Sequence, residues 1–217
     1  MLSVFVLNGC NSTTVLLANF KNDNIGSPPG ATQPTGTVSL NTGSGSITVV
    51  AAPNANLPAN KWALINHPSQ PTPETTLTGR FSRFFGLGQY GLLASLHIPR
   101  NAGVVTVQFE SFNQLGSFLH LDFMPEGDVR VDDNANARFG HFPRDTNFVL
   151  SVSLNITSTT ATAEITLLGP GASGNRTVNV QPILLPVARQ FGAVKFWVGF
   201  QHRASFFVDD IVVTRKN

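Results

Sequence analysis

Short apolar runs recur along the chain, and most are bounded by Gly, Pro, Asn or Asp. The clearest lies at 147–155, where apolar residues at the even positions alternate with Ser151, Ser153 and Asn155. Side chains alternate between the two faces of a strand, so this run predicts one buried face and one solvated face. Residues 160–168 repeat the pattern, which is typical of antiparallel strands rather than helices.

The same reasoning predicts an all-β fold, a two-sheet antiparallel β-sandwich. A turn or two of helix is expected around 186–191 only, and the prolines between 53 and 73 indicate edges and loops. The expected strands are 13–20, 36–40, 46–51, 61–65, 74–81, 90–98, 104–112, 117–123, 128–131, 147–155, 160–168, 177–180, 195–201 and 205–214.

Composition narrows the range of partners. The 217 residues are 41% hydrophobic and only 12% charged, about half the usual charged share. The formal net charge of +2 is too small and too dispersed for a nucleic-acid footprint. Segment 80–85 mixes arginines with phenylalanines, which can stack on bases, but alone it favours core and turn. We therefore expect no nucleic-acid partner.

A single cysteine, Cys10, excludes an internal disulfide. It follows an apolar run with Leu7 three residues before it and Gly9 directly before it, which resembles the end of a bacterial lipoprotein signal. Asn8 and the absence of a basic segment depart from that pattern. Two interpretations stay open: Cys10 carries a lipid, or it is an inert thiol in a buried strand. The first predicts an extracellular or cell-envelope protein that meets the membrane only through this anchor.

Two segments carry a family resemblance. Residues 17–20 (Leu-Ala-Asn-Phe) lead into 26–29 (Gly-Ser-Pro-Pro), and residues 206–213 read Phe-Phe-Val-Asp-Asp-Ile-Val-Val. Together they resemble the first and last strands of concanavalin A-like lectin/glucanase and laminin-G-like jelly rolls and of related carbohydrate-binding modules. The resemblance implies one jelly-roll domain over 13–217, preceded at 1–12 by a signal remnant or a tail. It supports the fold better than any ligand.

The resemblance also implies a structural calcium ion in several such modules. Its ligands there include an acidic residue after the first-strand Phe and an Asp in the last strand. Here Lys21 follows Phe20, but Asp209 and Asp210 stand in the final strand. We expect these two aspartates to be the metal ligands if calcium binds, although calcium requires six to eight oxygens. The alternative is an ordinary strand end with one solvated carboxylate.

Glucanases of this fold place their catalytic carboxylates on alternate positions of one strand. The nearest match is His120, Asp122 and Glu126, in which a histidine replaces the first acid and Glu126 follows Pro125 in an expected turn. A retaining hydrolase needs two carboxyl groups about 5–5.5 Å apart. The match is therefore incomplete, and we expect no catalytic residues.

Three predicted strands combine an apolar side with a polar side that includes an aromatic ring. If they share a sheet, one face collects an aromatic plate ringed by amides and carboxylates, as sugar binding uses. Alternatively, the tryptophan packs under a loop, and His120 simply bonds to Asp122. The residues of this predicted ligand-binding face are Gln108, Glu110, His120, Asp122, Trp197 and Gln201.

Three functions follow from these patterns. The first is a non-catalytic module that binds a polysaccharide or glycan at a cell surface or in the envelope. The second is a polysaccharide-cleaving enzyme that uses His120, Asp122 and Glu110, with Glu126 as a further candidate. The third is an extracellular structural or assembly protein, which would have a sealed face and large subunit contacts. A pair of carboxylates converging in a cleft would distinguish the second from the first.

Overall fold

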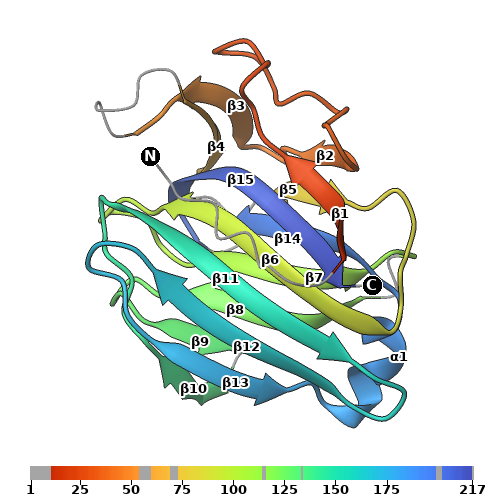
Figure 1. The fold of residues 1–217 in the computed structure, drawn as a ribbon. Helices are drawn as coiled ribbons and strands as arrows, with labels where there is room; N and C mark the ends of the chain where they lie inside the picture. The colour runs from red at the N-terminus through yellow and green to blue at the C-terminus, as the bar shows by residue number, and fades with distance from the viewer. Residues whose placement is uncertain are drawn as a thin grey trace.

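The computed structural model describes residues 11–53, 60–68, 73–113, 116–132, 134–198 and 202–216. Cys10 and Gln201 lie outside the described residues. Within these ranges the chain forms two antiparallel sheets that lie face to face (Figure 1). The all-β sandwich predicted from the alternation is confirmed.

An eight-stranded sheet faces the viewer in Figure 1. Strand β15 (Ala204–Lys216) pairs along one side with β6 and along the other with β4 and then β1. The last strand of the chain is thus central rather than peripheral. The order is β13 (Asn175–Asn179), β12 (Ala161–Leu168), β11 (Asn147–Ile156), β6 (Gly88–His97), β15, β4 (Lys61–His67) and β3 (Ser46–Ala51), with β1 (Ser12–Ala18) beside β15.

A seven-stranded sheet forms the second layer, with β14 and β7 near its middle. Its order is β10 (Asn134–Phe139), β9 (Val129–Val131), β8 (Ser117–Phe123), β7 (Val105–Ser111), β14 (Phe191–Val198), β5 (Thr75–Arg80) and β2 (Thr37–Asn41). Helical structure in the described residues consists of the 3-10 turn η1 (Pro182–Leu184) and the one-turn α1 (Leu185–Ala188).

Each predicted strand has a counterpart in the structure, and β3 and β8 match residue for residue. Two differences are informative. Strand β14 begins at Phe191, four residues before the predicted start. The prediction began too late because Gly192 and Ala193 interrupt the alternation that marks a strand. Strand β10 was not among the predicted strands, and it pairs with β9 across a register shift.

The core between the sheets is rich in phenylalanine. Phe191, at the start of β14, is 1% exposed, and its ring meets the Phe81 ring edge-on at 4.8 Å between centroids. It also contacts Phe118 of its own sheet and Tyr90 of the opposite sheet, at 5.5 and 5.2 Å. Edge-to-face pairs of this kind add to the stabilisation that burial provides. One ring therefore ties the two layers together.

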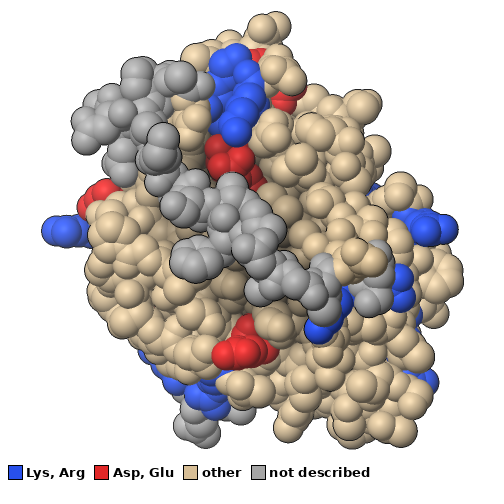
Figure 2. All heavy atoms as spheres, viewed as in Figure 1, with Lys and Arg blue, Asp and Glu red and all other residues tan. Residues whose placement is uncertain are grey.

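The outward face of the eight-stranded sheet carries little charge. Figure 2 views this face, and outside the grey atoms most of its spheres are uncharged residues, with Lys, Arg, Asp and Glu scattered. Residues 151, 153, 155, 162 and 166 contribute Ser, Thr and Asn side chains to it. Neither short helical segment within the described residues has the length and apolar character needed to cross a bilayer.

Candidate functional site

Polar side chains cover the outward face of the seven-stranded sheet in cross-strand rows. Antiparallel pairing places opposite residues about 5 Å apart on the same face, so each row is a line of neighbours. The first row runs Asn41, Thr76, Trp197, Thr106, Asp122 and Arg130. The second runs Ser39, Thr78, Lys195, Gln108 and His120, and the third runs Thr37, Arg80, Ala193, Glu110 and Ser117.

The structure therefore brings the predicted strands together. Gln108 and His120 face each other in the second row, while Trp197 and Asp122 flank Thr106 in the first. Glu110 lies one row further along β7. The sequence pattern predicted which face of its strand each residue lies on. The observed order of β8, β7 and β14 shows that these residues are neighbours.

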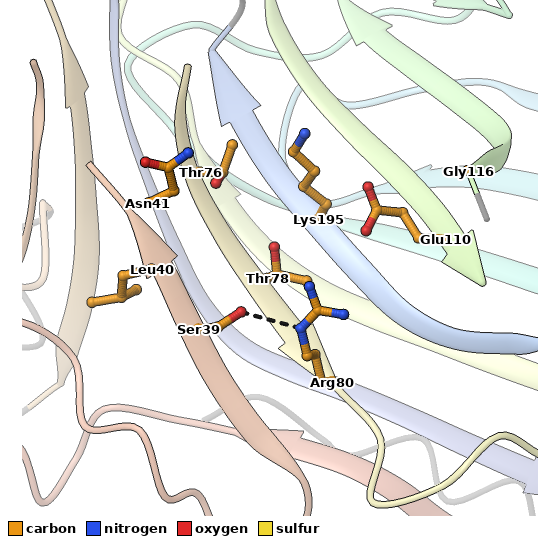
Figure 3. A pocket seen from close by; sticks show the side chains of 9 residues that line it. All are labelled: Ser39, Leu40, Asn41, Thr76, Thr78, Arg80, Glu110, Gly116 and Lys195. Carbon is orange, nitrogen blue, oxygen red and sulfur yellow. Dashed lines mark hydrogen bonds between the residues drawn. The ribbon is translucent and has the colours of Figure 1, made fainter. Parts of the chain in front are cut away.

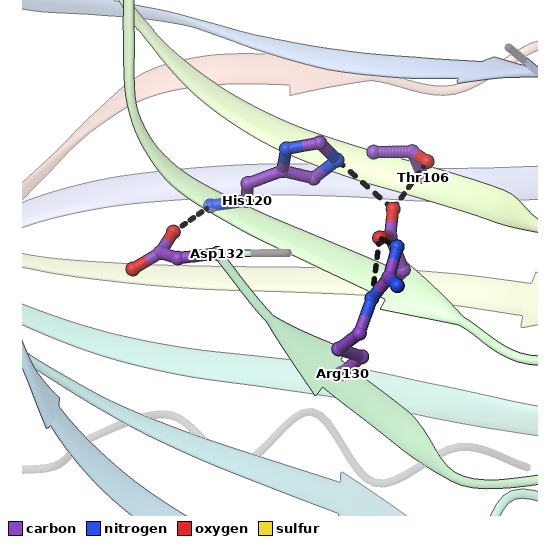
Figure 4. A network of polar contacts seen from close by, with 5 residues as sticks. Thr106, His120, Arg130 and Asp132 are labelled. Atoms are coloured by element: carbon purple, nitrogen blue, oxygen red, sulfur yellow. Dashed lines mark hydrogen bonds and ion pairs between the residues drawn. The ribbon is translucent and has the colours of Figure 1, made fainter. Parts of the chain in front are cut away.

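Asp122 is bonded to Thr106, His120 and Arg130, which are labelled in the polar network of Figure 4. Its side chain is buried, with 2% of the residue exposed, and its oxygens accept four hydrogen bonds. Oδ1 accepts from Thr106 Oγ1 at 2.7 Å and from His120 Nε2 at 2.9 Å. Oδ2 accepts from Arg130 Nη2 at 2.6 Å and from Arg130 Nε at 3.2 Å. Asp132 Oδ1 accepts a hydrogen bond from the backbone N–H of His120 at 2.9 Å, which adds a further contact to β8.

This network decides the charge of Asp122. Burial alone raises the pKa of its carboxyl, but the hydrogen bonds from His120, Arg130 and Thr106 outweigh it and hold the pKa below its ordinary value. Asp122 is thus an ionised carboxylate whose lone pairs are engaged by protein donors. It can fix the positions of His120 and Arg130, and it is poorly suited to donate a proton.

Trp197 lies between two charged or titratable side chains. The Lys195 Nζ is 4.7 Å from the centre of the indole ring. The His120 ring, from β8, lies 6.1 Å from the indole ring between centroids. The same Nζ donates to Glu74 Oε2 at 2.8 Å. Trp197 is half-buried, so the aromatic plate expected from the sequence carries a cation close to its ring.

A pocket of about 380 Å³ lies over β2, β5, β14 and β7 (Figure 3), and two of its lining residues, Thr76 and Lys195, are neighbours of Trp197. Its size falls within the range of small-molecule sites. Lys195 and Glu110 form one wall and Arg80 another, and the Arg80 Nε donates to Ser39 Oγ at 3.3 Å. The lining residues are Ser39, Leu40, Asn41, Thr76, Thr78, Arg80, Glu110, Gly116 and Lys195.

Among the described residues that were predicted to bind ligand, Glu110 alone lines this pocket. The pocket instead lies toward β2 and β5, whose polar residues the sequence reasoning passed over. A signal was available, since Thr76, Thr78 and Arg80 alternate with Leu77 and Gly79 in the predicted strand. What the pattern could not supply was the position of β5 next to β14.

The acidic residues of the enzyme hypothesis do not form a close pair. Asp122 faces Thr106, and Glu110 lies four residues further along β7, a backbone separation of about 13 Å. Glu126 is exposed in the turn after β8, as its place after Pro125 predicted. Retaining and inverting glycosidases hold their carboxyl groups within about 10 Å.

A second buried carboxylate lies on the other sheet. Asp209 of β15 is 1% exposed, and no hydrogen bond of good geometry reaches its oxygens among the described residues, although the backbone N–H groups of Asp210 and Phe20 lie close enough to oppose part of the rise in its pKa. Burial first and the neighbouring charge of Asp210 second raise the pKa of Asp209 to about 7. Asp210 adopts a left-handed φ of 47°, where the pairing with β6 shifts register. Its Oδ1 lies 4.0 Å from Lys21 Nζ.

These surroundings bear on the expected calcium site. Within the described residues, no group of three or more His, Cys, Asp or Glu side chains gathers where one metal ion could lie. Asp209 and Asp210 offer carboxylate oxygens, but Lys21 places an ammonium group where the resemblance implied an acid. Calcium binding by the two aspartates stays a prediction.

Comparison with known proteins locates the fold. No family model matches the chain, and no curated protein sequence matches it. An endo-1,3-β-glucanase from Streptomyces sioyaensis superposes with a TM-score of 0.58 at 11% identity, over 94% of this chain and 96% of that one. Lectin UEA-II complexed with galactose gives 0.52 at 10% identity, over 94% and 100%.

A sialidase gives a TM-score of 0.57 at 11% identity, over 93% of this chain but only 18% of the sialidase, so the chain spans a minor part of that protein. At such low identity these similarities concern the fold. They confirm the lectin/glucanase-like jelly roll predicted from the two terminal segments.

Proposed function

We propose that the chain is a non-catalytic glycan-binding module whose binding surface is the outward face of the seven-stranded sheet. One observation carries the proposal: the three polar rows meet at a pocket with Trp197 beside it. Arg80, Glu110 and Lys195 present charged donors and acceptors to sugar hydroxyls. The lectin fold to which the chain is similar gives the proposal independent support, since one such structure is named for its complex with galactose.

The binding mode follows from the geometry. Lys195 is held between Glu74 and the Trp197 ring, so a sugar that enters the pocket meets an oriented ammonium group. Asp122 takes no direct part, because its lone pairs are engaged; it acts by fixing His120 and Arg130. The wide separation of Asp122 and Glu110 favours binding without cleavage.

The test is a glycan array with wild-type protein and single variants. Trp197→Ala should weaken binding, because it removes the ring against which the Lys195 ammonium group is held at the edge of the pocket. Glu110→Gln and Lys195→Gln should each weaken it about tenfold, the usual effect of losing a hydrogen bond to a charged group. Glu164→Gln, on the outward face of the other sheet, is the matched control and should leave binding unchanged.

Two outcomes would reject the proposal. Equal binding by Glu110→Gln and Glu164→Gln would place the sugar elsewhere. Release of sugar fragments by the wild-type protein, lost in Glu110→Gln, would establish the cleaving enzyme instead. If Trp197→Ala unfolds in a thermal melt, Lys195→Gln and Glu110→Gln still decide the question, because their side chains reach the pocket from the surface.

A further inference from the structure

A second pocket, distinct from the polar rows, lies at the end of the molecule where α1 is drawn in Figure 1. Residues 84–87, in the loop before β6, line it together with Ser158, Arg189 and Arg215. Its volume is about 510 Å³, enough for a small organic ligand. Four separate parts of the chain thus meet here: the loop before β6, the β11–β12 turn, the end of α1 and the end of β15.

The two arginines of this pocket have unused donors. Arg189 donates Nη2 to the backbone oxygen of Ser158, and Arg215 donates Nη2 to that of Leu87 at 3.2 Å. The Nε atom of each is buried and has no hydrogen-bond partner among the described residues. A buried donor without an acceptor is unfavourable, and a guanidinium group has five N–H donors in a planar fork.

Within the part of the chain that the structure describes, no carboxylate forms an ion pair with these arginines. Among the described residues, none of the ion pairs within 4.0 Å involves Arg189, Arg215 or the adjacent Arg83. Their backbone contacts orient the two guanidinium groups without satisfying their charge. Such a pair is suited to a carboxylate or phosphate group, which arginine can bind through two parallel hydrogen bonds.

The rest of the lining is apolar and aromatic. Phe84 is 53% exposed and Leu87 is 46% exposed, although both are large apolar side chains. The Phe85 ring lies 5.6 Å from the Arg215 guanidinium carbon and 5.1 Å from that of Arg83. Gly88 has a φ of 141°, and a Cβ there would stand 3.3 Å from Arg215 Nε, so a larger residue at this position would crowd the Arg215 side chain. An exposed ring beside uncompensated cations suits a ligand with both an apolar and an anionic part.

We infer that this pocket binds a small organic anion, with an oxyanion group on Arg189 and Arg215 and a flat apolar ring against Phe84. The carboxylate and the phosphate share this chemistry, and the experiment distinguishes them. The site is independent of the proposed glycan surface, because none of its lining residues belongs to the polar rows.

The experiment is isothermal titration of the whole protein with phenyl phosphate, benzoate, inorganic phosphate and benzyl alcohol. Phenyl phosphate or benzoate should bind at least about tenfold more tightly than benzyl alcohol, because the neutral probe gains nothing from the arginines. The tighter of the two anions identifies the oxyanion. Arg189→Gln and Arg215→Gln should each weaken that binding about tenfold. Arg100→Gln removes the same charge from a side chain that is 84% exposed, and it should have no effect.

Phe84→Ala tests the apolar half of the site and does not threaten folding, because the ring is largely exposed. It should weaken binding of phenyl phosphate but not of inorganic phosphate. Thermal melts accompany each variant, and if Arg215→Gln unfolds, Arg189→Gln and Phe84→Ala carry the test. The inference is overturned if neither aromatic anion binds, or if Arg189→Gln binds them as well as Arg100→Gln does.

Discussion

At the scale of single residues, the charge of Asp122 is the most consequential feature of the polar face. Four donors from three side chains converge on it, and removing one partner from a buried ion pair leaves the other uncompensated. Asp122→Asn should therefore lower the free energy of unfolding by about 3 kcal/mol, measured by urea denaturation at neutral pH. Asp145→Asn, whose partner Arg100 is exposed, should lower it by less than about 1 kcal/mol.

The pH dependence of that difference has a definite sign. The folded pKa of Asp122 is depressed, so its contribution to stability is present above the unfolded pKa and lost as the pH falls toward the folded value. The gap between wild type and Asp122→Asn should hold above about pH 5 and narrow below about pH 4. A gap that stays constant into the acid range would contradict the assigned ionisation.

Asp209 has the opposite behaviour. Its folded pKa is raised to about 7, so the folded protein holds a proton that the unfolded chain releases near pH 4. The contribution of Asp209 to the stability of the wild type should therefore decline as the pH rises from about 4 to about 7, by as much as about 4 kcal/mol, and level off above. In the presence of a chelator, Asp209→Asn should flatten this decline and be the more stable protein at pH 8.

The same two proteins test the predicted calcium site. Calcium that binds only the folded state raises the melting temperature by mass action. If Asp209 and Asp210 are ligands, added calcium chloride should raise the melting temperature of the wild type at pH 8 and leave Asp209→Asn unchanged. Equal responses of the two proteins would remove these aspartates from any calcium site.

The alternation of residues predicted which face of a strand a side chain lies on far better than it predicted which side chains it contacts. Gln108, His120, Asp122 and Trp197 were placed on polar faces by alternation alone, and each lies there. The sequence did not predict that Arg130 bonds to Asp122, because their contact depends on the pairing of β8 with β9. Pairing between strands distant in sequence is a property of topology, which local periodicity does not encode.

At the scale of elements, the short strand β14 joins the polar face to the core. Its alternation presents Lys195 and Trp197 outward, and Phe196 and Val198 inward with no measurable exposure. Its first residue, Phe191, escaped the sequence prediction, because the small residues that follow it break the pattern. Phe191 nevertheless lies in the sheet, because its packing in the core outweighs the weak local preference for a strand.

Phe191 offers a direct measure of how the layers are held together. Phe191→Ala removes a ring that contacts Phe81, Phe109, Phe118 and Tyr90, and it should lower the free energy of unfolding by about 3–5 kcal/mol in urea. Phe84→Ala loses the same atoms from an exposed position and should change stability by less than about 0.5 kcal/mol. Similar losses for the two variants would mean that the cluster around Phe191 is not the main link between the sheets.

At the scale of the whole molecule, the two outward faces differ in character. One carries the polar rows and a pocket, and the other is broad and nearly uncharged (Figure 2). Composition anticipated this division only in general terms, since a chain with few charges must solvate its sheets with Ser, Thr and Asn. The sequence could not predict which sheet carries the pocket, because this depends on the order of the seven strands.

An envelope location, with a lipid on Cys10, stays a prediction from the sequence. If Cys10 is lipidated, the protein should sediment with membranes on cell fractionation, and Cys10→Ser should move it to the soluble fraction. The reason is that each acyl chain adds apolar area which the bilayer removes from water. Identical fractionation of the two proteins would leave the inert-thiol interpretation.

The central position of β15 has a consequence for how the protein is made. This strand follows every other described strand in the chain, yet it pairs with β1, β4 and β6. Until its residues leave the ribosome, the larger sheet lacks its middle, and the edges of those three strands have nothing to pair with. Unpaired edges of this kind are prone to aggregate, and chains built from such distant contacts fold slowly. The nascent chain should therefore depend on chaperones, and removing residues 204–216 should prevent folding altogether rather than trim an edge.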